Sequence, residues 1–541
     1  MKKFKKLASL VLALVMALTM AVSVSAATVT VPSDGILKDH TFTAYQVFSG
    51  REEGGVLSDV QWGDGISSDA FLTALKADTT YGKLFAGCTD AAAVAKVLGD
   101  NNTNTALANA VAKLAYANKT GEGTALASGE NTLANGYYLV VDTTADVGEG
   151  GAYNTALLQV VGNINITVKT DAPTVEKKVL EDDKYNQDGG YGTGYNDVAD
   201  YNMGDAVPFH LIGSVPDMSR YDTYKYIFHD TLSDGLTAPS EDSIEVYLSA
   251  DKTLDASDTA VTDDFAINIS EQKITVSCDD LKKVVSNDTK YVIVAYSAVL
   301  NQNAVVGLDG NPNVVYLEYS NKPDQSGSGD TGNTGKTPED KVIVFTYELD
   351  TTKVDGQNKE TKLKDAKFVL LNSDGTKVAK ITNDKFDGWQ DLPAAGDDGK
   401  IAATAWATDT VLTSDNNGLF KVIGLDDGTY KLREIVAPSG YNLLSSDITV
   451  VITATTANGQ TWTNGQASSA LTNLEVKADE TAGTGDTNTG IANITVANNK
   501  GSTLPETGGM GTTIFYVVGA ILVLGAGILL ITRRRMNKAA K

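Results

Sequence analysis

Three polar residues occupy apolar faces of alternating segments between residues 342 and 498. Lys353 continues the face that begins with Ile343, Asn498 follows Val496 by two positions, and Glu434 lies within an alternating segment near residue 432. Side chains on a strand point to opposite faces in turn, so all three are expected to point inward. A buried charge needs a partner, and these groups can satisfy one another if they meet. Two interpretations stay open: the three groups react with one another, or they form a buried Lys–Glu ion pair with a hydrogen-bonded Asn amide.

The middle of the chain carries a second set of the same chemical types. Alternation places Lys177, Asp205 and Asn321 on apolar strand faces, and Lys178 on the opposite face from Lys177. We therefore predict a second lysine, acid and asparagine group, with Lys178 as the alternative lysine. An ordinary β-sandwich with charges on its edges is the structural alternative.

Short strands must position these groups. Runs rich in β-branched and aromatic residues, separated by turn residues, predict strands at 41–48, 137–141, 207–211, 291–299, 342–349, 429–436 and 491–497. Residues 70–76 and 91–98 have apolar spacing typical of helices. The predicted fold is mainly β, with tandem immunoglobulin-like β-sandwich domains. The first domain is expected to carry a helical insertion.

The two ends of the chain are hydrophobic. A basic start, an apolar run and a small-residue cleavage site at Ala26 predict a signal peptide over residues 1–26. Roughly 480 residues lie between the ends, enough for about three domains. The expected divisions are an N-terminal domain at 27–170, a second at 171–323, a linker at 324–340, a third at 341–500, and a C-terminal segment at 504–541.

Composition excludes several classes of function. The net charge is −24, which argues against nucleic-acid binding. The two cysteines, Cys88 and Cys278, cannot build a disulfide framework. With three histidines and no Cys/His cluster, a zinc or histidine-dependent catalytic site is not expected, and no cofactor is predicted. Calcium binding stays open at residues 183–189, although a solvated turn is the preferred interpretation.

The C-terminal segment resembles the cell-wall sorting signal of Gram-positive surface proteins. It carries Leu504, Pro505, Glu506, Thr507 and Gly508, then an apolar run at 514–531 and three arginines. The run is long enough to span a bilayer, and the arginines would stay on the cytoplasmic side. The resemblance implies that a sortase cleaves after Thr507 and passes its carbonyl to an amine. A plain membrane anchor is the alternative.

The third domain resembles collagen-adhesin B-type domains. The resemblance rests on TKVD, YKLREIVAPSGYN and VANNKG, which contain Lys353, Glu434 and Asn498. In that family the lysine amine attacks the asparagine carboxamide and releases ammonia, leaving an intramolecular isopeptide bond. The reaction needs a neutral lysine and a protonated acid, both favoured by burial, and close contact.

The second domain resembles the isopeptide-forming domain of fimbrial proteins. A Gly-Asp pair at 204–205 and a D-T-L-x-D-G-L element at 230–236 carry this resemblance. It implies a bond between Lys177 and Asn321 assisted by Asp205. The first domain shows no such group, because its early strand at 42–48 has no inward lysine, and we predict no isopeptide bond there.

The opening of the mature chain resembles the first domain of major backbone pilins, through AYQVFSG, LSDVQWGDGI and NGYYLVVD. In such pilins a lysine near the end of this domain attacks the sortase-bound threonine of the next subunit. Lys169 is the expected nucleophile, although the Tyr-Pro of the family motif is absent. A surface lysine without this role is the alternative, and Lys177 and Lys178 are the competing lysines.

The whole chain is thus expected to be a structural pilus subunit, not an enzyme. Its expected partners are pilus-specific and housekeeping sortases, other copies of itself and peptidoglycan, with accessory pilins and a host surface as further candidates. The expected location is the cell surface, covalently attached to the wall. A wall-anchored adhesin that is never polymerised and a wall-anchored hydrolase are the alternatives.

Overall fold

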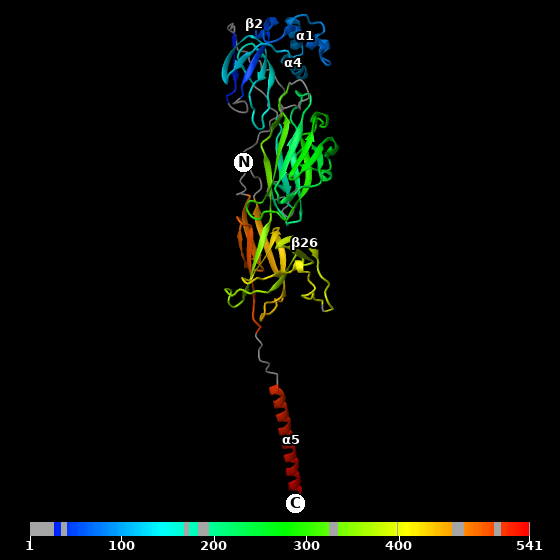
Figure 1. The fold of residues 1–541 in the computed structure, drawn as a ribbon, viewed down its shortest axis with the longest axis vertical. Coiled ribbons are helices and arrows are strands. Elements are labelled where there is room, and N and C mark those ends of the chain that lie inside the picture. The colour runs from blue at the N-terminus through cyan, green and yellow to red at the C-terminus, as the bar shows by residue number, and fades with distance from the viewer. Residues whose placement is uncertain are drawn as a thin grey trace.

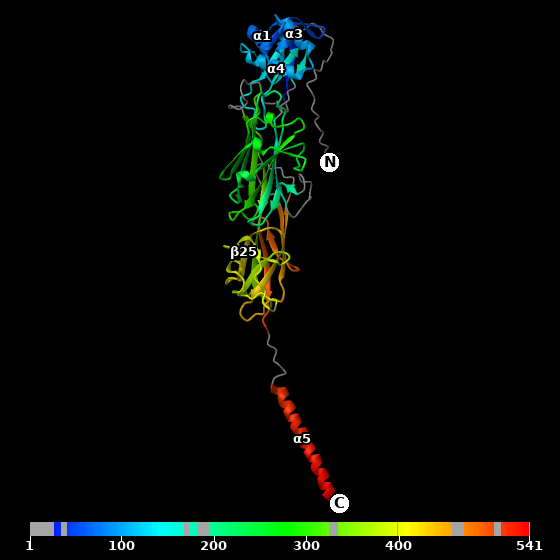
Figure 2. The ribbon, with the colours of Figure 1, turned by 90° about the vertical axis from the view of Figure 1, so that its right-hand side faces the viewer.

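The computed structural model describes residues 26–33, 40–166, 172–181, 194–323, 334–397, 399–456, 470–501 and 510–539. Three β-rich units follow one another along a rod (Figures 1 and 2). Their hydrophobic cores are built between residues 26 and 501. The mainly β, tandem fold predicted from the sequence is confirmed.

The first unit combines two sheets with four helices. One sheet has the order β5-β1-β8, and the other β3-β2-β6-β7 with β4 beside β2. The helices lie between β3 and β4, as the predicted insertion requires, and Asp90 and Asn104 cap two of them through the N–H groups of Ala93 and Leu107. The elements are β1 Ala26–Val31, β2 Phe42–Glu53, β3 Val56–Trp62, α1 Ser68–Ala77, α2 Gly82–Phe85, α3 Ala91–Asp100, α4 Thr105–Ala117, β4 Thr124–Leu126, β5 Gly129–Ala134, β6 Gly136–Asp142, β7 Thr155–Val160 and β8 Ile164–Asn165.

The second unit is a sandwich of two sheets. One has the order β10-β9-β12-β19-β15-β16, with β14 beside β19. The other has the order β11-β22-β20-β13-β18-β17, with β21 beside β20. The strands are β9 Val175–Leu180, β10 Tyr195–Asn196, β11 Val198–Asp200, β12 Ala206–Ser214, β13 Tyr226–Leu232, β14 Leu236–Thr237, β15 Glu245–Ser249, β16 Thr259–Ala260, β17 Ala266–Ser270, β18 Lys273–Cys278, β19 Tyr291–Leu300, β20 Asn311–Ser320, β21 Thr334–Lys336 and β22 Asp340–Phe345.

The second sheet of this unit continues beyond the boundary expected at residue 323. Within residues 334–340, expected as linker, residues 334–336 form β21 and Asp340 begins β22. Val342 and Val344 of β22 belong to the core of the second unit, whereas Ile343 and Phe345 belong to the core of the third. A strand buried on both faces therefore joins the two units. The composition of the preceding Gly- and Ser-rich stretch does not reveal where this strand begins.

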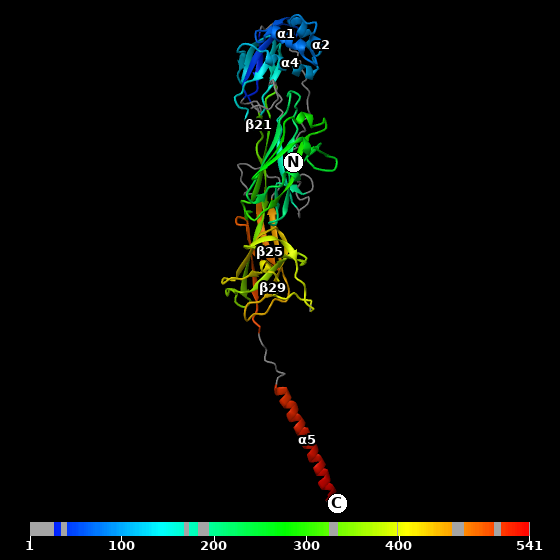
Figure 3. The same ribbon diagram turned by 45° about the vertical axis from the view of Figure 1, so that its right-hand side comes forward.

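The third unit is one continuous sheet folded over its core. Its order is β32-β31-β30-β29-β24-β25-β26-β28-β23-β34-β33, with β27 beside β24, and its first and last long strands, β23 and β34, pair in parallel. Figure 3 shows β25 and β29 in this unit. The strands are β23 Tyr347–Asp355, β24 Lys367–Leu371, β25 Lys377–Thr382, β26 Lys385–Asp391, β27 Leu412–Thr413, β28 Leu419–Leu425, β29 Gly428–Val436, β30 Ile448–Thr456, β31 Leu471–Ala478, β32 Thr481–Ala482, β33 Thr484–Asp486 and β34 Ile491–Asn498.

The last element is helix α5, Met510–Ala539. Its segment Phe515–Met536 is long and apolar enough to cross a membrane by length and composition, and none of it is buried against the rest of the protein. The described β-rich part therefore holds its cores without help from α5. The predicted signal peptide up to residue 25 and the sorting motif Leu504–Gly508 lie outside the described residues, as does Lys169.

Candidate functional site

The third unit brings Lys353, Glu434 and Asn498 together in its core. Lys353 comes from β23, Asn498 ends the neighbouring strand β34, and Glu434 projects from β29. Lys353 and Asn498 are 0% exposed and Glu434 is 5% exposed. Alternation explains the convergence, because apolar residues precede each of them on the same face of the strand.

The contacts connect the three groups in a closed set. Lys353 Nζ donates to Asn498 Oδ1 and lies 3.9 Å from Glu434 Oε1. Asn498 Nδ2 donates to Glu434 Oε2 at 2.9 Å. Glu434 therefore spans both nitrogens that an amide exchange would involve, the attacking Nζ and the departing Nδ2.

The surroundings of this group disfavour a charged lysine. The Phe368 ring centroid lies 5.8 Å from Lys353 Nζ. Burial lowers the pKa of Lys353 to about 8, while the charge of Glu434 acts in the opposite direction. The loop after β29 closes the site, since Leu444 N donates to Glu434 Oε2 at 2.8 Å and Asn498 Nδ2 donates to Asn442 O at 2.7 Å.

The second unit also buries a lysine, but with different partners from those predicted. Lys177 Nζ donates to Asp230 Oδ1 at 2.5 Å and to the Tyr296 hydroxyl at 3.2 Å. Asn313 Nδ2 donates to the same hydroxyl at 2.8 Å. Lys177 and Tyr296 belong to one sheet of the sandwich, and Asp230 and Asn313 to the other, so the group bridges the core.

The prediction of Asp205 and Asn321 as partners of Lys177 is corrected by the strand register. Lys177 pairs with Leu211, and Asp205 lies about 20 Å back along that strand. Asn321 lies about 26 Å beyond Asn313 along β20, where its backbone oxygen accepts the Tyr153 N–H at the first unit. Alternation identifies the face of a residue but not its height along the strand.

Two of the three residues that the sequence analysis did not predict, Asp230 and Asn313, had visible signals, and Tyr296 did not. Asp230 is the first residue of the D-T-L-x-D-G-L element, and Asn313 lies on the same face of β20 as Asn321. Tyr296 lies within the strand predicted at 291–299, but nothing in that strand distinguishes its hydroxyl from those of other core tyrosines.

The environment of Lys177 resembles that of Lys353. The Phe209 ring centroid lies 5.4 Å from Nζ, and the Lys177 side chain is fully buried. Burial lowers the pKa of Lys177 to about 8, opposed by the nearby Asp230 carboxylate. Both sites can therefore present a lysine amine that loses its proton far more easily than an exposed one.

Lys178, the alternative lysine, is also buried, and it forms an ion pair with Asp197. Neither Lys177 nor Lys178 is therefore exposed to a second protein. Lys178 lines a cavity of about 350 Å³ together with residues 174–176 and 337–340, but its amine is turned to Asp197.

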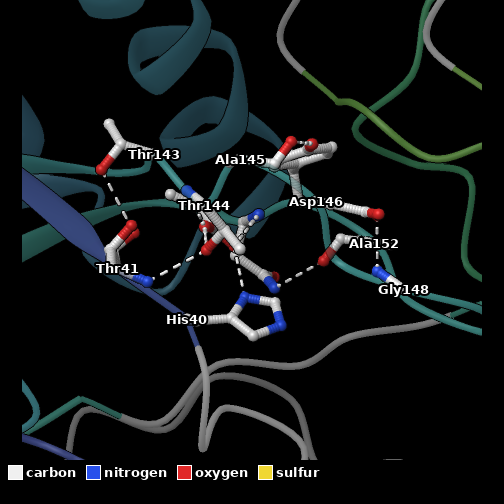
Figure 4. Close-up of polar contacts among 11 residues, drawn as sticks. His40, Thr41, Thr143, Thr144, Ala145, Asp146, Gly148 and Ala152 are labelled. Atoms are coloured by element: carbon white, nitrogen blue, oxygen red, sulfur yellow. Dashed lines mark hydrogen bonds and ion pairs between the residues drawn. The ribbon is translucent and has the colours of Figure 1, made fainter.

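The first unit holds a different polar group, where β2 begins and β6 ends (Figure 4). His40 Nδ1 lies 2.7 Å from Asp142 Oδ2, and both residues are buried. Asp142 Oδ1 accepts the Thr144 N–H at 3.1 Å, and Thr144 Oγ1 accepts the Thr41 N–H at 3.0 Å. These hydrogen bonds tie the segment before β2 to the end of β6.

Among the described residues, Asp200, Asp426 and Asp427 offer carboxylate oxygens within 4.8 Å of one another. They lie where the second and third units meet, and the Tyr347 hydroxyl donates to Asp200 Oδ2 at 2.8 Å. This is the kind of oxygen cluster that could hold a hard cation.

Comparisons with known proteins agree along the chain. Residues 203–323 match the Gram-positive pilin backbone subunit 2, Cna-B-like domain family. Residues 347–466 match the prealbumin-like fold domain family, and residues 497–538 match the LPXTG cell wall anchor motif.

Individual relatives are distant. The trypsin-resistant surface T6 protein of Streptococcus pyogenes serotype M6 is 22% identical over 62% of this chain, and the match spans 65% of that protein's length. The solved T6 backbone pilin of the same serotype is 17% identical, with a TM-score of 0.49, over 89% of this chain and 100% of that chain. The major pilin SpaD of Corynebacterium diphtheriae is 16% identical, with a TM-score of 0.45, over 88% of this chain and 98% of that chain.

The three matched segments occur in the order that a wall-anchored shaft protein requires, with the anchor last. The anchor motif includes the apolar helix α5 and locates the protein at the cell wall. The chain thus carries, in this order, the Cna-B-like domain of Gram-positive pilin backbone subunits, a prealbumin-like domain and an LPXTG cell wall anchor motif.

Proposed function

We propose that this chain is the shaft subunit of a covalently polymerised pilus, and that two internal isopeptide bonds stiffen it. One bond joins Lys353 to Asn498, and the other joins Lys177 to Asn313. The observation that carries the proposal is a buried lysine in each of two units, in contact with a buried acid and connected to a buried asparagine amide.

The chemistry in the third unit follows from these contacts. Lys353 Nζ gives a proton to Glu434 and attacks Cγ of Asn498, whose carbonyl electron pair moves to Oδ1. Glu434 then gives a proton to Nδ2 and takes the second proton from Nζ, so ammonia leaves and the carbonyl re-forms. Fixed proximity replaces the encounter of two separate reactants, and Glu434 supplies general acid–base catalysis. Each site reacts once.

The position of the bonds suits a shaft under tension. Lys353–Asn498 would join the first and last long strands of its unit, which run parallel. Each bond would close a loop of about 140 residues, which by analogy with disulfides stabilises by about 5 kcal/mol through the unfolded chain. No disulfide serves this purpose in the described residues, because both cysteines are free and buried.

Mapping the linked peptides tests both bonds directly. Tandem mass spectrometry of a protease digest is expected to find one peptide pair joined through Lys353 and Asn498, and another through Lys177 and Asn313. A pair joined through Asn321 would overturn the assignment of Asn313. Linear peptides containing all four unmodified residues would overturn the proposed cross-linking.

For polymerisation, we propose that Thr507 is joined to Lys169 of the next subunit. Both lie outside the described residues. Support comes from the competing lysines, since Lys177 and Lys178 are buried and paired with carboxylates and an intermolecular nucleophile must be reachable.

The test is a wall extract from cells carrying Lys169→Ala, with Lys83→Ala as control. Lys83 is exposed on α2 of the same unit. The Lys83 variant should retain a ladder of high-mass species that resists boiling detergent, and the Lys169 variant should lose it. An unchanged ladder in Lys169→Ala would exclude Lys169, and absence of a ladder from the unaltered protein would favour the non-polymerised adhesin.

A further inference from the structure

The Tyr296 hydroxyl occupies the centre of the reactive group in the second unit. It accepts a hydrogen bond from Lys177 Nζ at 3.2 Å and from Asn313 Nδ2 at 2.8 Å. It also donates to Asp230 Oδ2. One oxygen thus contacts the attacking nitrogen, the departing nitrogen and the acid, while the Tyr296 side chain is 4% exposed.

The third unit achieves the same connections without a tyrosine. There Glu434 lies 3.9 Å from Lys353 Nζ with one carboxylate oxygen and 2.9 Å from Asn498 Nδ2 with the other. Aspartate is shorter than glutamate by one carbon–carbon bond, about 1.5 Å. Within the part of the chain that the structure describes, Asn313 Nδ2 donates its hydrogen bond to the Tyr296 hydroxyl and not to Asp230.

We propose that Tyr296 is a catalytic residue of the second unit, which relays a proton from the attacking Lys177 to the departing amide nitrogen of Asn313. Asp230 and Tyr296 together then perform the task that Glu434 performs alone in the third unit. This inference rests on the proposed isopeptide chemistry and adds to it a residue that neither strand pattern nor motif indicates.

The protons balance along this route. Lys177 Nζ begins with three protons and gives one to Asp230. The Nζ electron pair then attacks Cγ of Asn313, and the carbonyl pair moves to Oδ1. The second Nζ proton passes to the Tyr296 oxygen while the Tyr296 hydroxyl proton passes to Nδ2. Ammonia leaves with the C–N electron pair, the carbonyl re-forms, and Tyr296 is restored.

The phenol is suited to a relay because it stays neutral. Burial raises the pKa of Tyr296 well above its ordinary value, and the charge of Asp230 acts in the same direction. A neutral hydroxyl both donates and accepts, as a relay requires. The stacked Phe209 ring, 5.5 Å away between centroids, holds the tyrosine in place.

The test compares Tyr296→Phe with Tyr296→Phe/Asp230→Glu in residues 27–503. Phenylalanine keeps the ring packing and removes the relay oxygen, and glutamate restores the reach that Glu434 has. Each protein is purified unfolded, before bond formation, and refolded by dilution; samples are quenched in acid and their intact masses are followed over time.

We expect the unaltered chain to lose ammonia twice, and Tyr296→Phe to lose the second-unit ammonia at least about 100-fold more slowly. The double variant should recover most of the rate. The third-unit loss should proceed unchanged in every variant, which shows that refolding and detection work.

Formation of both bonds by Tyr296→Phe at the normal rate would overturn the relay. Failure of both variants to form the second-unit bond would also overturn the relay. The relay predicts that the longer acid of the double variant restores bond formation, whereas a defect in packing would not be restored by it. If the unaltered chain forms no second-unit bond, the isopeptide proposal itself fails, and this result is distinct from the other two.

Discussion

Lys177 Nζ and Asp230 Oδ1 lie 2.5 Å apart across the core of the second unit, and both side chains are 0% exposed. Moving two charges from water into a protein interior costs free energy that their mutual attraction often does not repay, so a buried ion pair is weak evidence for a stabilising role. In our account this contact removes a proton from the lysine and prepares it to attack Asn313.

The first prediction distinguishes Asp230 from Asp205, the acid expected from the Gly-Asp pair at 204–205. Asp230→Asn should abolish the second-unit bond, because asparagine cannot accept the lysine proton. Asp205→Asn is the matched control, since Asp205 is half-buried and accepts a hydrogen bond from Asn202 Nδ2. Intact mass should show one ammonia loss for Asp230→Asn and two for Asp205→Asn. The reverse pattern would restore Asp205 to the site.

The second prediction concerns the stability of the third unit. Glu434→Gln keeps the size of the side chain but cannot take the proton of Lys353, so the bond to Asn498 should not form. The unit should lose about 5 kcal/mol of stability against unfolding. Differential scanning calorimetry and the rate of trypsin cleavage between residues 347 and 501 would measure the loss. An unchanged melting profile would show that the bond does not stabilise this unit.

The third prediction is a pH dependence. The reaction needs a neutral lysine together with a protonated acid, so the reactive pair holds one proton in total. Burial places the pKa of Lys177 and Lys353 at about 8, below the ordinary lysine value. Above pH 8 this shared proton is lost, and the rate of bond formation after refolding should fall about tenfold per pH unit. A rate that instead rises through pH 8 would mean that the free amine attacks without acid assistance.

The fourth prediction tests the joint between the second and third units. Gly424 has a φ of +91°, and a Cβ there would clash with the side chain of Met203, across the joint. Gly440 is the control, because its φ is also positive, at +85°, but nothing lies within 4 Å of a Cβ. Gly424→Ala should therefore destabilise by about 2 kcal/mol more than Gly440→Ala. Equal effects in calorimetry would show that the joint is not tightly packed at this point.

Much of this architecture could be predicted from the sequence, because strand alternation is a local property. The inward positions of Glu434 and Asn498 follow from apolar residues two positions away, and that of Lys353 follows from Leu349, four positions before it on the same face. The register between distant strands is not local, so the sequence could not place Asp230 rather than Asp205 beside Lys177. The double burial of β22 was hidden for a related reason, since each face of the strand contacts a different unit.

Intact mass spectrometry of residues 27–503 tests the central claim most directly. Each lysine attack on an asparagine amide expels one ammonia, about 17 Da, so the account predicts a deficit of about 34 Da from the sequence mass. The deficit should fall to about 17 Da in Glu434→Gln and in Asp230→Asn, and to zero when both changes are combined. A mass equal to that of the unmodified sequence would contradict the account and leave two buried ion-pair networks in a wall-anchored shaft protein.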